Sequence, residues 1–187
     1  RKQIGPTNKE PDRLFVLDAN GNKKDGVKPI TVNNKDILPS LAGKSNLEEK
    51  EYPWRATVSI KYDKEKKQEI VTQKYSMIKG NYGKTRSEWE AKNVFKFLGK
   101  NSDVEWGLKG YKNGDWLIGT LYSSSQAPLF TGLGTDYRLE NAIYDAHSHG
   151  RSYGGPSPED LSQPSPKFGR WLLEPHNPDP NKRWIKY

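Results

Sequence analysis

The chain has 187 residues, which suits a single domain, and it is polar, with 32% hydrophobic residues and a mean hydropathy of −1.00. Aromatic residues make up 11% of the chain, so a modest core and long polar loops are expected. No window approaches the roughly 18 apolar residues of a membrane span, and no apolar amino-terminal stretch resembles a signal peptide.

An amino-terminal extension rich in β-structure is predicted first. Residues 1–12 are polar and punctuated by proline, which is typical of a flexible segment. Residues 14–17 form an apolar run that enters an Asn-Gly turn over residues 18–22. Residues 29–32 are expected to return as a second strand. Residues 38–50 fit either a short helix or a loop.

A β-hairpin is predicted next. In residues 54–62 every second side chain is apolar or aromatic, which is the periodicity of a strand. Residues 68–78 are expected to pair with this strand across a turn at residues 63–67. Lysines cluster around the turn and indicate a solvated surface. They are Lys61, Lys64, Lys66 and Lys67.

A helix is predicted after the hairpin. Ser87 and Glu90 have the spacing of a capping box, and apolar residues follow Ala91 at the third, fourth and seventh positions. The pattern predicts about three helical turns that end before Gly99. Beyond it, strands are expected over residues 104–108, 116–122 and 142–149, with a glycine-rich loop around residues 131–135.

Two of the three histidines lie one residue apart near the end of the last of these strands. On a strand, His147 and His149 project from the same face, so both imidazoles can reach one point. A seven-residue loop follows, and then Ser157 and Pro158 form a typical helix start with Asp160 facing back toward the strand. Two histidines and one carboxylate match catalytic zinc sites, which keep one position open. The chain has no cysteine for a thiolate-rich structural site.

The spacing His-x-His, seven residues, Ser, two residues, Asp resembles the signature of the JAMM family of zinc isopeptidases and peptidases. That family also has a glutamate at the start of a strand that follows a helix. Glu105 matches it, 147 − 105 = 42 positions before His147. Glu88, Glu90 and Asp103 are nearby acids that rival it for this role.

The resemblance covers residues 87–163 and implies an α/β (α+β) fold of the JAB/MPN type, a mixed twisted sheet packed between helices. Residues 1–50 then form an amino-terminal extension or junction, and residues 51–187 form the metallopeptidase domain. The chain begins at Arg1 rather than methionine, which suggests a piece of a longer protein.

The sequence departs from the family pattern at two places. Gly150 stands where many members have proline after the second histidine. Pro164 and Pro166 curtail the helix after Asp160, so the closing elements are expected to be short. Residues 171–173 and 183–187 are the segments that can supply a truncated return.

The resemblance also implies a chemistry. His147, His149 and Asp160 would bind one Zn²⁺ ion with water at the fourth position. Glu105 would act as general base and acid, and Ser157 would donate a hydrogen bond to the oxyanion. The reaction implied is hydrolysis of an amide bond in a protein or peptide substrate, either a peptide bond or a lysine isopeptide bond.

The loop-rich core and the Asp-x-Asn-Gly-Asn hairpin are similar to JAB-like toxin modules at the carboxyl ends of bacterial polymorphic toxins, including Rhs-type proteins. This resemblance implies a toxic effector that is secreted or delivered to a target cell as part of a larger protein. It also implies a cognate immunity protein as a partner.

Two other functions stay open. A metal-dependent nuclease would use the same ligands, helped by the basic first half. However, residues 1–100 carry 22 − 13 = +9 charges and residues 101–160 carry 4 − 8 = −4, so the candidate site lies in the acidic part and nucleic acid is disfavoured as a partner. A non-catalytic MPN-type binding module is the third hypothesis.

Each residue also has a purely structural explanation. Ser157 and Asp160 suit a helix cap whether or not a metal binds. His176 lies among prolines and is expected to face solvent. Tryptophans are better explained as core than as a binding platform, notably Trp106, Trp116 and Trp171.

Overall fold

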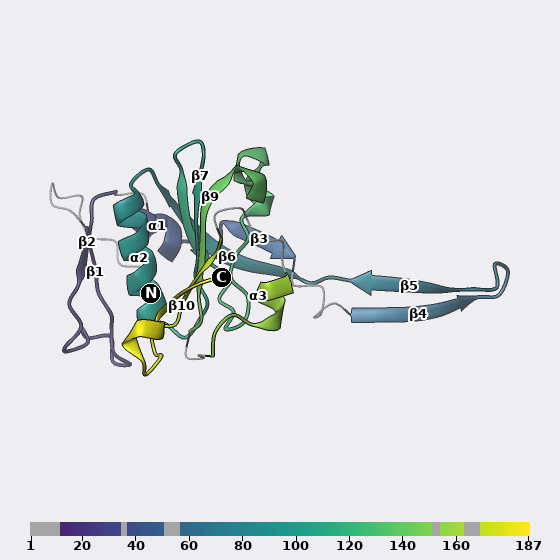
Figure 1. Cartoon of the computed structure of the whole chain (residues 1–187), viewed down its shortest axis with the longest axis horizontal. Helices are drawn as coiled ribbons and strands as arrows, with labels where there is room; N and C mark the ends of the chain where they lie inside the picture. The colour runs from purple at the N-terminus through teal and green to yellow at the C-terminus, as the bar shows by residue number, and fades with distance from the viewer. Residues whose placement is uncertain (1–11, 35–36, 51–56, 151–153, 163–168) are drawn as a thin grey trace.

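A seven-stranded mixed sheet forms the centre of the protein in a computed structural model that describes residues 12–34, 37–50, 57–150, 154–162 and 169–187 (Figure 1). The strand order is β11-β10-β9-β7-β8-β6-β3, and every neighbouring pair is antiparallel except β9 and β10. The predicted α+β fold with a mixed twisted sheet is therefore confirmed. The strands are β3 Leu47–Lys50, β6 Met77–Thr85, β7 Gly107–Tyr111, β8 Trp116–Thr120, β9 Ala142–Ser148, β10 Trp171–Leu173 and β11 Trp184–Lys186.

Helix α2, Glu88–Lys100, covers one face of the sheet (Figure 1). It begins as predicted, with the Ser87 hydroxyl accepting the Glu90 amide hydrogen at 3.2 Å. It continues one residue past Gly99, where the prediction ended it. That glycine lies where the helix touches the sheet, and a Cβ there would stand 3.0 Å from the Ser148 Cβ. The core on this face comprises Ala91, Val94, Phe95, Trp106, Leu108, Trp116, Ile118, Ala146 and Leu173.

The opposite face of the sheet is covered by an irregular segment rather than a long helix. The predicted glycine-rich loop forms three short 3₁₀ turns, η2 Thr131–Leu133, η3 Thr135–Tyr137 and η4 Leu139–Asn141. Alternation along β8 places Leu117 on this face and its two neighbours on the α2 face. The second core comprises Leu47, Tyr111, Leu117, Leu121, Phe130 and Ala142.

The amino-terminal extension packs beside α2. The return strand β2, Ile30–Val32, forms as predicted, but its antiparallel partner β1 is Asp12–Leu14 and meets the predicted strand 14–17 at Leu14 alone; Leu17 makes only an isolated bridge with Lys23. Asp18 accepts backbone hydrogen bonds within the predicted turn. Of the undecided residues 38–50, the first part is helix α1, Ile37–Ala42, and the last part is strand β3. Residues of this extension share the core under α2, namely Val32, Ile37 and Leu41. A domain boundary near residue 50 stays a prediction.

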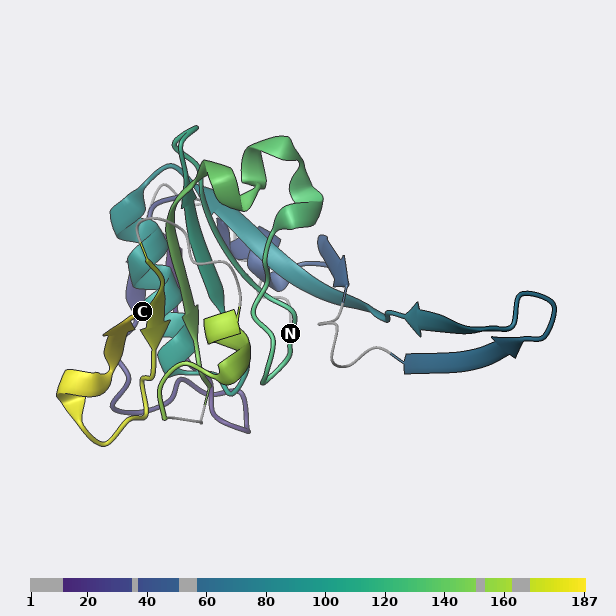
Figure 2. The same ribbon diagram turned by 45° about the vertical axis from the view of Figure 1, so that its right-hand side comes forward.

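The predicted hairpin projects from the body of the protein (Figures 1 and 2). It consists of β4, Thr57–Asp63, and β5, Gln68–Lys74, and residues 54–56 of the predicted first strand lie outside the described residues. The predicted second strand, residues 68–78, is divided in the structure: β5 ends at Lys74, and β6 begins at Met77 and enters the main sheet.

The carboxyl-terminal part closes the sheet. The truncated return predicted over residues 171–173 and 183–187 is confirmed, because β10 pairs with β9 and β11 pairs with β10. Helix α3, Pro158–Ser162, is a single short turn, and the two prolines expected to end it lie outside the described residues. His176 is exposed, as predicted. None of the described helices is long and apolar enough to cross a membrane.

Candidate metal centre

The two histidines lie at the carboxyl end of β9, in the interior of the sheet between β7 and β10. His147 pairs with Gly107 on one side and Leu172 on the other, and the amide of His149 donates to the Leu173 carbonyl at 3.0 Å. Both imidazoles project from the face opposite α2, because the intervening residues of the strand point the other way. The sheet therefore fixes the backbone of both residues.

Asp160 reaches this point from α3. Ser157 is the N-cap, since its hydroxyl accepts the Asp160 amide hydrogen at 3.1 Å, and the Asp160 carboxylate in turn accepts the Ser157 amide hydrogen at 2.9 Å. The Ser157 hydroxyl also donates to the same carboxylate oxygen at 2.9 Å. The capping explanation of this pair is thus correct, and the cap itself orients the carboxylate toward the histidines.

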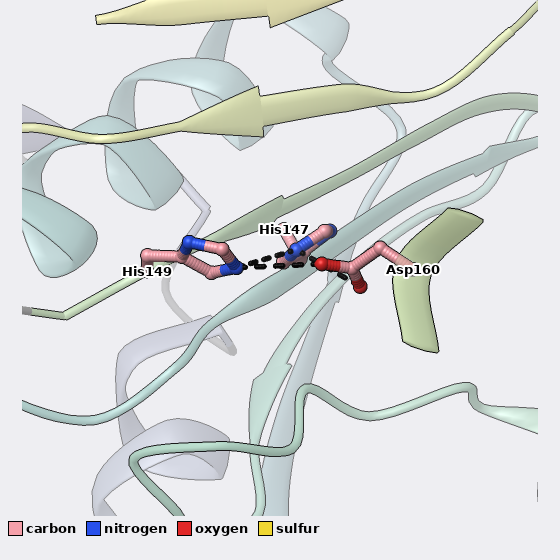
Figure 3. A group of neighbouring side chains, drawn as sticks. All are labelled: His147, His149 and Asp160. Carbon is pink, nitrogen blue, oxygen red and sulfur yellow. Dashed lines mark hydrogen bonds and ion pairs between the residues drawn. The ribbon is translucent and has the colours of Figure 1, made fainter. Parts of the chain in front are cut away.

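The three side chains converge on one point (Figure 3). The two Nε2 atoms are 3.3 Å apart, and they lie 3.4 Å from different oxygens of Asp160, His147 from Oδ1 and His149 from Oδ2. A tetrahedral zinc ion with bonds of about 2.0–2.1 Å separates its ligand atoms by about 3.3 Å. His147, His149 and Asp160 can therefore hold a metal ion, and both the donor types and their spacing fit zinc.

Glu105 lies beside this cluster, two residues before β7 begins rather than within the strand. Its amide donates to the Ser123 carbonyl at 2.7 Å, and the next residue, Trp106, bonds twice to Ser148 of β9. Its side chain is buried. Burial raises the pKa of Glu105, the charges of His147 and His149 lower it, and Asp160 raises it further. The structure thus brings the predicted base into the electrostatic field of the three candidate ligands.

A family model described as JAB-like toxin 1 matches residues 83–177. The chain belongs to this family. The matched part includes α2, β7 to β10 and every candidate site residue, whereas the hairpin of β4 and β5 lies outside it. Neither a curated protein nor a solved structure gave a significant match to the chain.

Glycine follows the second histidine of this JAB-like domain for a steric reason. A Cβ at Gly150 would lie 2.5 Å from the carbonyl oxygen of Asp103, which precedes Glu105 by two residues. The departure from the JAMM pattern at this position therefore removes no ligand. It allows the histidine strand and the glutamate loop to touch through their backbones.

A buried group of charges adjoins His147 in the toxin domain and was not recognised in the sequence. Lys109 and Asp145 form an ion pair, and Arg170 Nε donates to the other oxygen of Asp145 at 3.1 Å. Burial alone would raise the pKa of Asp145, but the two cations hold it below its ordinary value. Together with His147 and Asp160 these residues line one small cavity. The sequence position of Asp145 could have indicated it, because Asp145 lies two residues before His147 and therefore on the same face of the strand.

Two further residues contact the histidines on the side away from Asp160, and no local pattern in the sequence indicated either of them. The carboxylate of Glu174, which is fully buried, lies 3.7 Å from His149 Nδ1 and accepts the amide hydrogens of Gly154 and Gly155, both at 2.8 Å. The Tyr187 hydroxyl lies 3.4 Å from the Nδ1 of His147. Glu174 thereby connects His149 to the loop that leads to Asp160. Contacts of this kind, made by residues that do not bind the metal themselves, fix the orientation of metal-binding imidazoles.

Proposed function

We propose that this chain is the effector domain of a larger bacterial toxin and that it hydrolyses an amide bond of a protein substrate as a zinc-dependent peptidase or isopeptidase. The observation that supports this most is the spacing of 3.3–3.4 Å between the donor atoms of His147, His149 and Asp160. That spacing is close to the roughly 3.3 Å between ligand atoms of a tetrahedral zinc ion, and a small rotation of the Asp160 carboxylate would bring one oxygen to both imidazoles. Membership of a JAB-like toxin family supports the same proposal.

Glu105 is the proposed general base and acid. A zinc ion held by the three ligands would lower the pKa of water toward about 7 and polarise the scissile carbonyl. Glu105 would accept the proton of the attacking water and deliver it to the leaving amine. A carboxylate whose pKa is raised by burial suits both transfers, because proton exchange is most efficient when the pKa approaches the working pH.

Ser157 is the proposed donor to the oxyanion. Its single hydroxyl proton is donated to Asp160 in the substrate-free protein, so this role requires the hydroxyl to rotate toward the substrate. The Ser157 amide hydrogen would remain on the Asp160 carboxylate and keep it in position. Loss of one oxyanion donor costs about 10²–10³ in kcat, so Ser157→Ala should lose most of its activity. Its metal affinity should fall as well, because only the amide contact to Asp160 remains, and activity is therefore compared at saturating zinc.

The toxin family further supports delivery to a target cell. A dedicated immunity protein that protects the producer is a further part of the proposal. The net charge of −4 over residues 101–160, from four basic and eight acidic residues, favours a protein substrate over nucleic acid around the site.

The test joins metal content to hydrolysis. Elemental analysis of the purified chain is expected to find about one zinc per molecule, and incubation with a proteome should yield new amino termini or freed lysines in mass spectra. Glu105→Gln should retain zinc and lose hydrolysis, whereas His147→Ala should lose both. Glu88→Gln, on the exposed side of α2, is the matched control and should change neither.

Full hydrolysis by Glu105→Gln would exclude this base. Zinc-dependent cleavage of DNA or RNA, with no new peptide ends, would establish the nuclease instead.

A further inference from the structure

The hairpin of β4 and β5 is an isolated ribbon, here called the hairpin arm (residues 57–74). Its two strands pair over seven residues each, from Thr57 with Lys74 to Asp63 with Gln68, and pair with no other strand of the described chain. It extends away from the sheet (Figures 1 and 2). A lone two-stranded hairpin is at best marginally stable in water, so this arm lacks the packing that strands normally have.

The register gives the arm two different faces, because residues directly opposite one another share a face. Val58 lies opposite Gln73, Ile60 opposite Val71, and Tyr62 opposite Glu69. This apolar face is open to solvent, with exposed fractions of 54% for Val58, 62% for Ile60, 61% for Tyr62 and 61% for Val71. The polar face comprises Thr57, Ser59, Lys61, Asp63, Gln68, Ile70, Thr72 and Lys74.

Contiguous exposed apolar residues mark interaction sites in soluble proteins. A second copy of the chain is a poor partner for the apolar face, because two arms would bury too little surface on each other. Seven residues at about 3.4 Å each and two strands about 4.8 Å apart give one face a footprint of roughly 240 Å². Two arms stacked face to face would bury about 500 Å², less than half of the roughly 1,200 Å² of a stable interface. A partner that encloses both faces and the edges can reach that size.

The charge of the arm indicates which polar groups the partner carries around the apolar contact. The arm has five lysines and three acids, so its net charge is 5 − 3 = +2. Asp63, one of the three acids, is engaged in the turn, where its carboxylate accepts the amide hydrogens of Glu65 and Lys66. The lysines lie on the polar face and at the turn, so a complementary partner carries carboxylates there. They are Lys61, Lys64, Lys66, Lys67 and Lys74.

We propose that the hairpin arm inserts into a groove of another protein, with an apolar floor against Val58, Ile60 and Val71 and an acidic rim facing the lysines. The arm is thus a docking element that contributes no candidate ligand to the metal centre. Burial on a partner supplies the packing that the arm lacks within its own chain.

The purified chain gives the first test. Light scattering after gel filtration is expected to show a monomer, because two arms bury too little area on each other. A dimer that dissociates on Ile60→Ser with Val71→Ser would show that the occupant is a second copy and would overturn the proposal.

Photocrosslinking in the producing bacterium gives the second test. A benzophenone amino acid replaces Val58 on the apolar face, Val71 across from Ile60, or Trp89, which is 64% exposed on α2. The two arm positions are expected to capture the same protein, and Trp89 is not. Capture of nucleic acid, capture of no protein, or equal capture at Trp89 would each contradict the proposal.

The captured protein is then purified and titrated against the chain by calorimetry. Ile60→Ser with Val71→Ser should weaken binding at least tenfold, whereas Ser59→Ala with Thr72→Ala, on the polar face, should change it less than twofold. Both variants should hold as much metal as the unaltered chain, which separates this proposal from the hydrolase proposal. Equal affinity of the two variants would exclude the apolar face as the contact.

Discussion

The candidate metal centre and the hairpin arm differ in how far the rest of the chain contacts their side chains. At the metal centre each candidate ligand has a second contact: Glu174 behind His149, Tyr187 near His147 and Ser157 on Asp160. In the arm nearly every side chain is open to solvent. A site that holds a small ion must be organised before the ion arrives, whereas a surface that binds a protein can be completed by its partner. Substitutions should therefore affect stability and metal binding at one region and partner binding at the other.

The largest expected effect comes from the buried charges beside the site. Asp145→Asn removes the carboxylate that Lys109 and Arg170 share, and breaking a buried ion pair costs about 3–5 kcal/mol of unfolding free energy. Glu69→Gln in the arm, an exposed carboxylate, is the matched control and should cost less than about 0.5 kcal/mol. Urea unfolding of both variants measures the difference, and equal losses would remove the contrast between the two regions.

Zinc should stabilise the body of the protein by a smaller amount. Free zinc at about 100 times its dissociation constant adds about 2.7 kcal/mol, which corresponds to a rise of roughly 5–10 °C in Tm for a chain of this size. Thermal melts with and without a chelator give the measurement. His147→Ala should melt at one temperature in both conditions, and a zinc-dependent rise in that variant would place the metal elsewhere.

The outer contacts should tune affinity rather than folding. Glu174→Gln keeps the shape of the side chain but removes the charge behind His149, and loss of such a contact lowers metal affinity about 10–100-fold. Competition with a zinc chelator measures the constant. Tyr187→Phe should have the lesser effect, since its hydroxyl is 3.4 Å from the Nδ1 of His147. Unchanged affinity in both variants would show that the sheet alone positions the imidazoles.

The smallest effect is expected in the arm. Ile60→Ser with Val71→Ser should change the unfolding free energy of the isolated chain by less than about 0.5 kcal/mol, because both side chains are more than half exposed. A loss above about 2 kcal/mol would mean that the arm packs on the body in solution, and the contrast with the metal centre would fail.

Local patterns predicted those parts of the molecule that depend on neighbours in sequence. The cap at Ser87, helix α2 and the convergence of His147, His149 and Asp160 follow from spacings of a few residues. Glu174 and Tyr187 were missed because they directly follow β10 and β11, two strands whose register in the sheet no local pattern specifies. The roles of Glu105 and Ser157 in catalysis stay predictions.

Two strands show why the rest could not be predicted. The second half of β6 is rich in polar residues and glycine, yet it pairs with β8 over residues 81–85, so long-range pairing overrode its composition. β4 has a clear alternating pattern, which usually indicates one buried face, yet both of its faces are exposed. Periodicity identified a strand there without showing what would cover it.

The contact between Gly150 and the Asp103 carbonyl has a consequence for how this domain can diverge. The segment that ends the histidine strand and the segment that leads to Glu105 meet backbone to backbone, with no room for even a methyl group between them. The path of the main chain therefore sets the separation between Glu105 and the two imidazoles. Substitutions of the surrounding side chains should leave Glu105 and the imidazoles at the same separation, provided that residue 150 stays glycine.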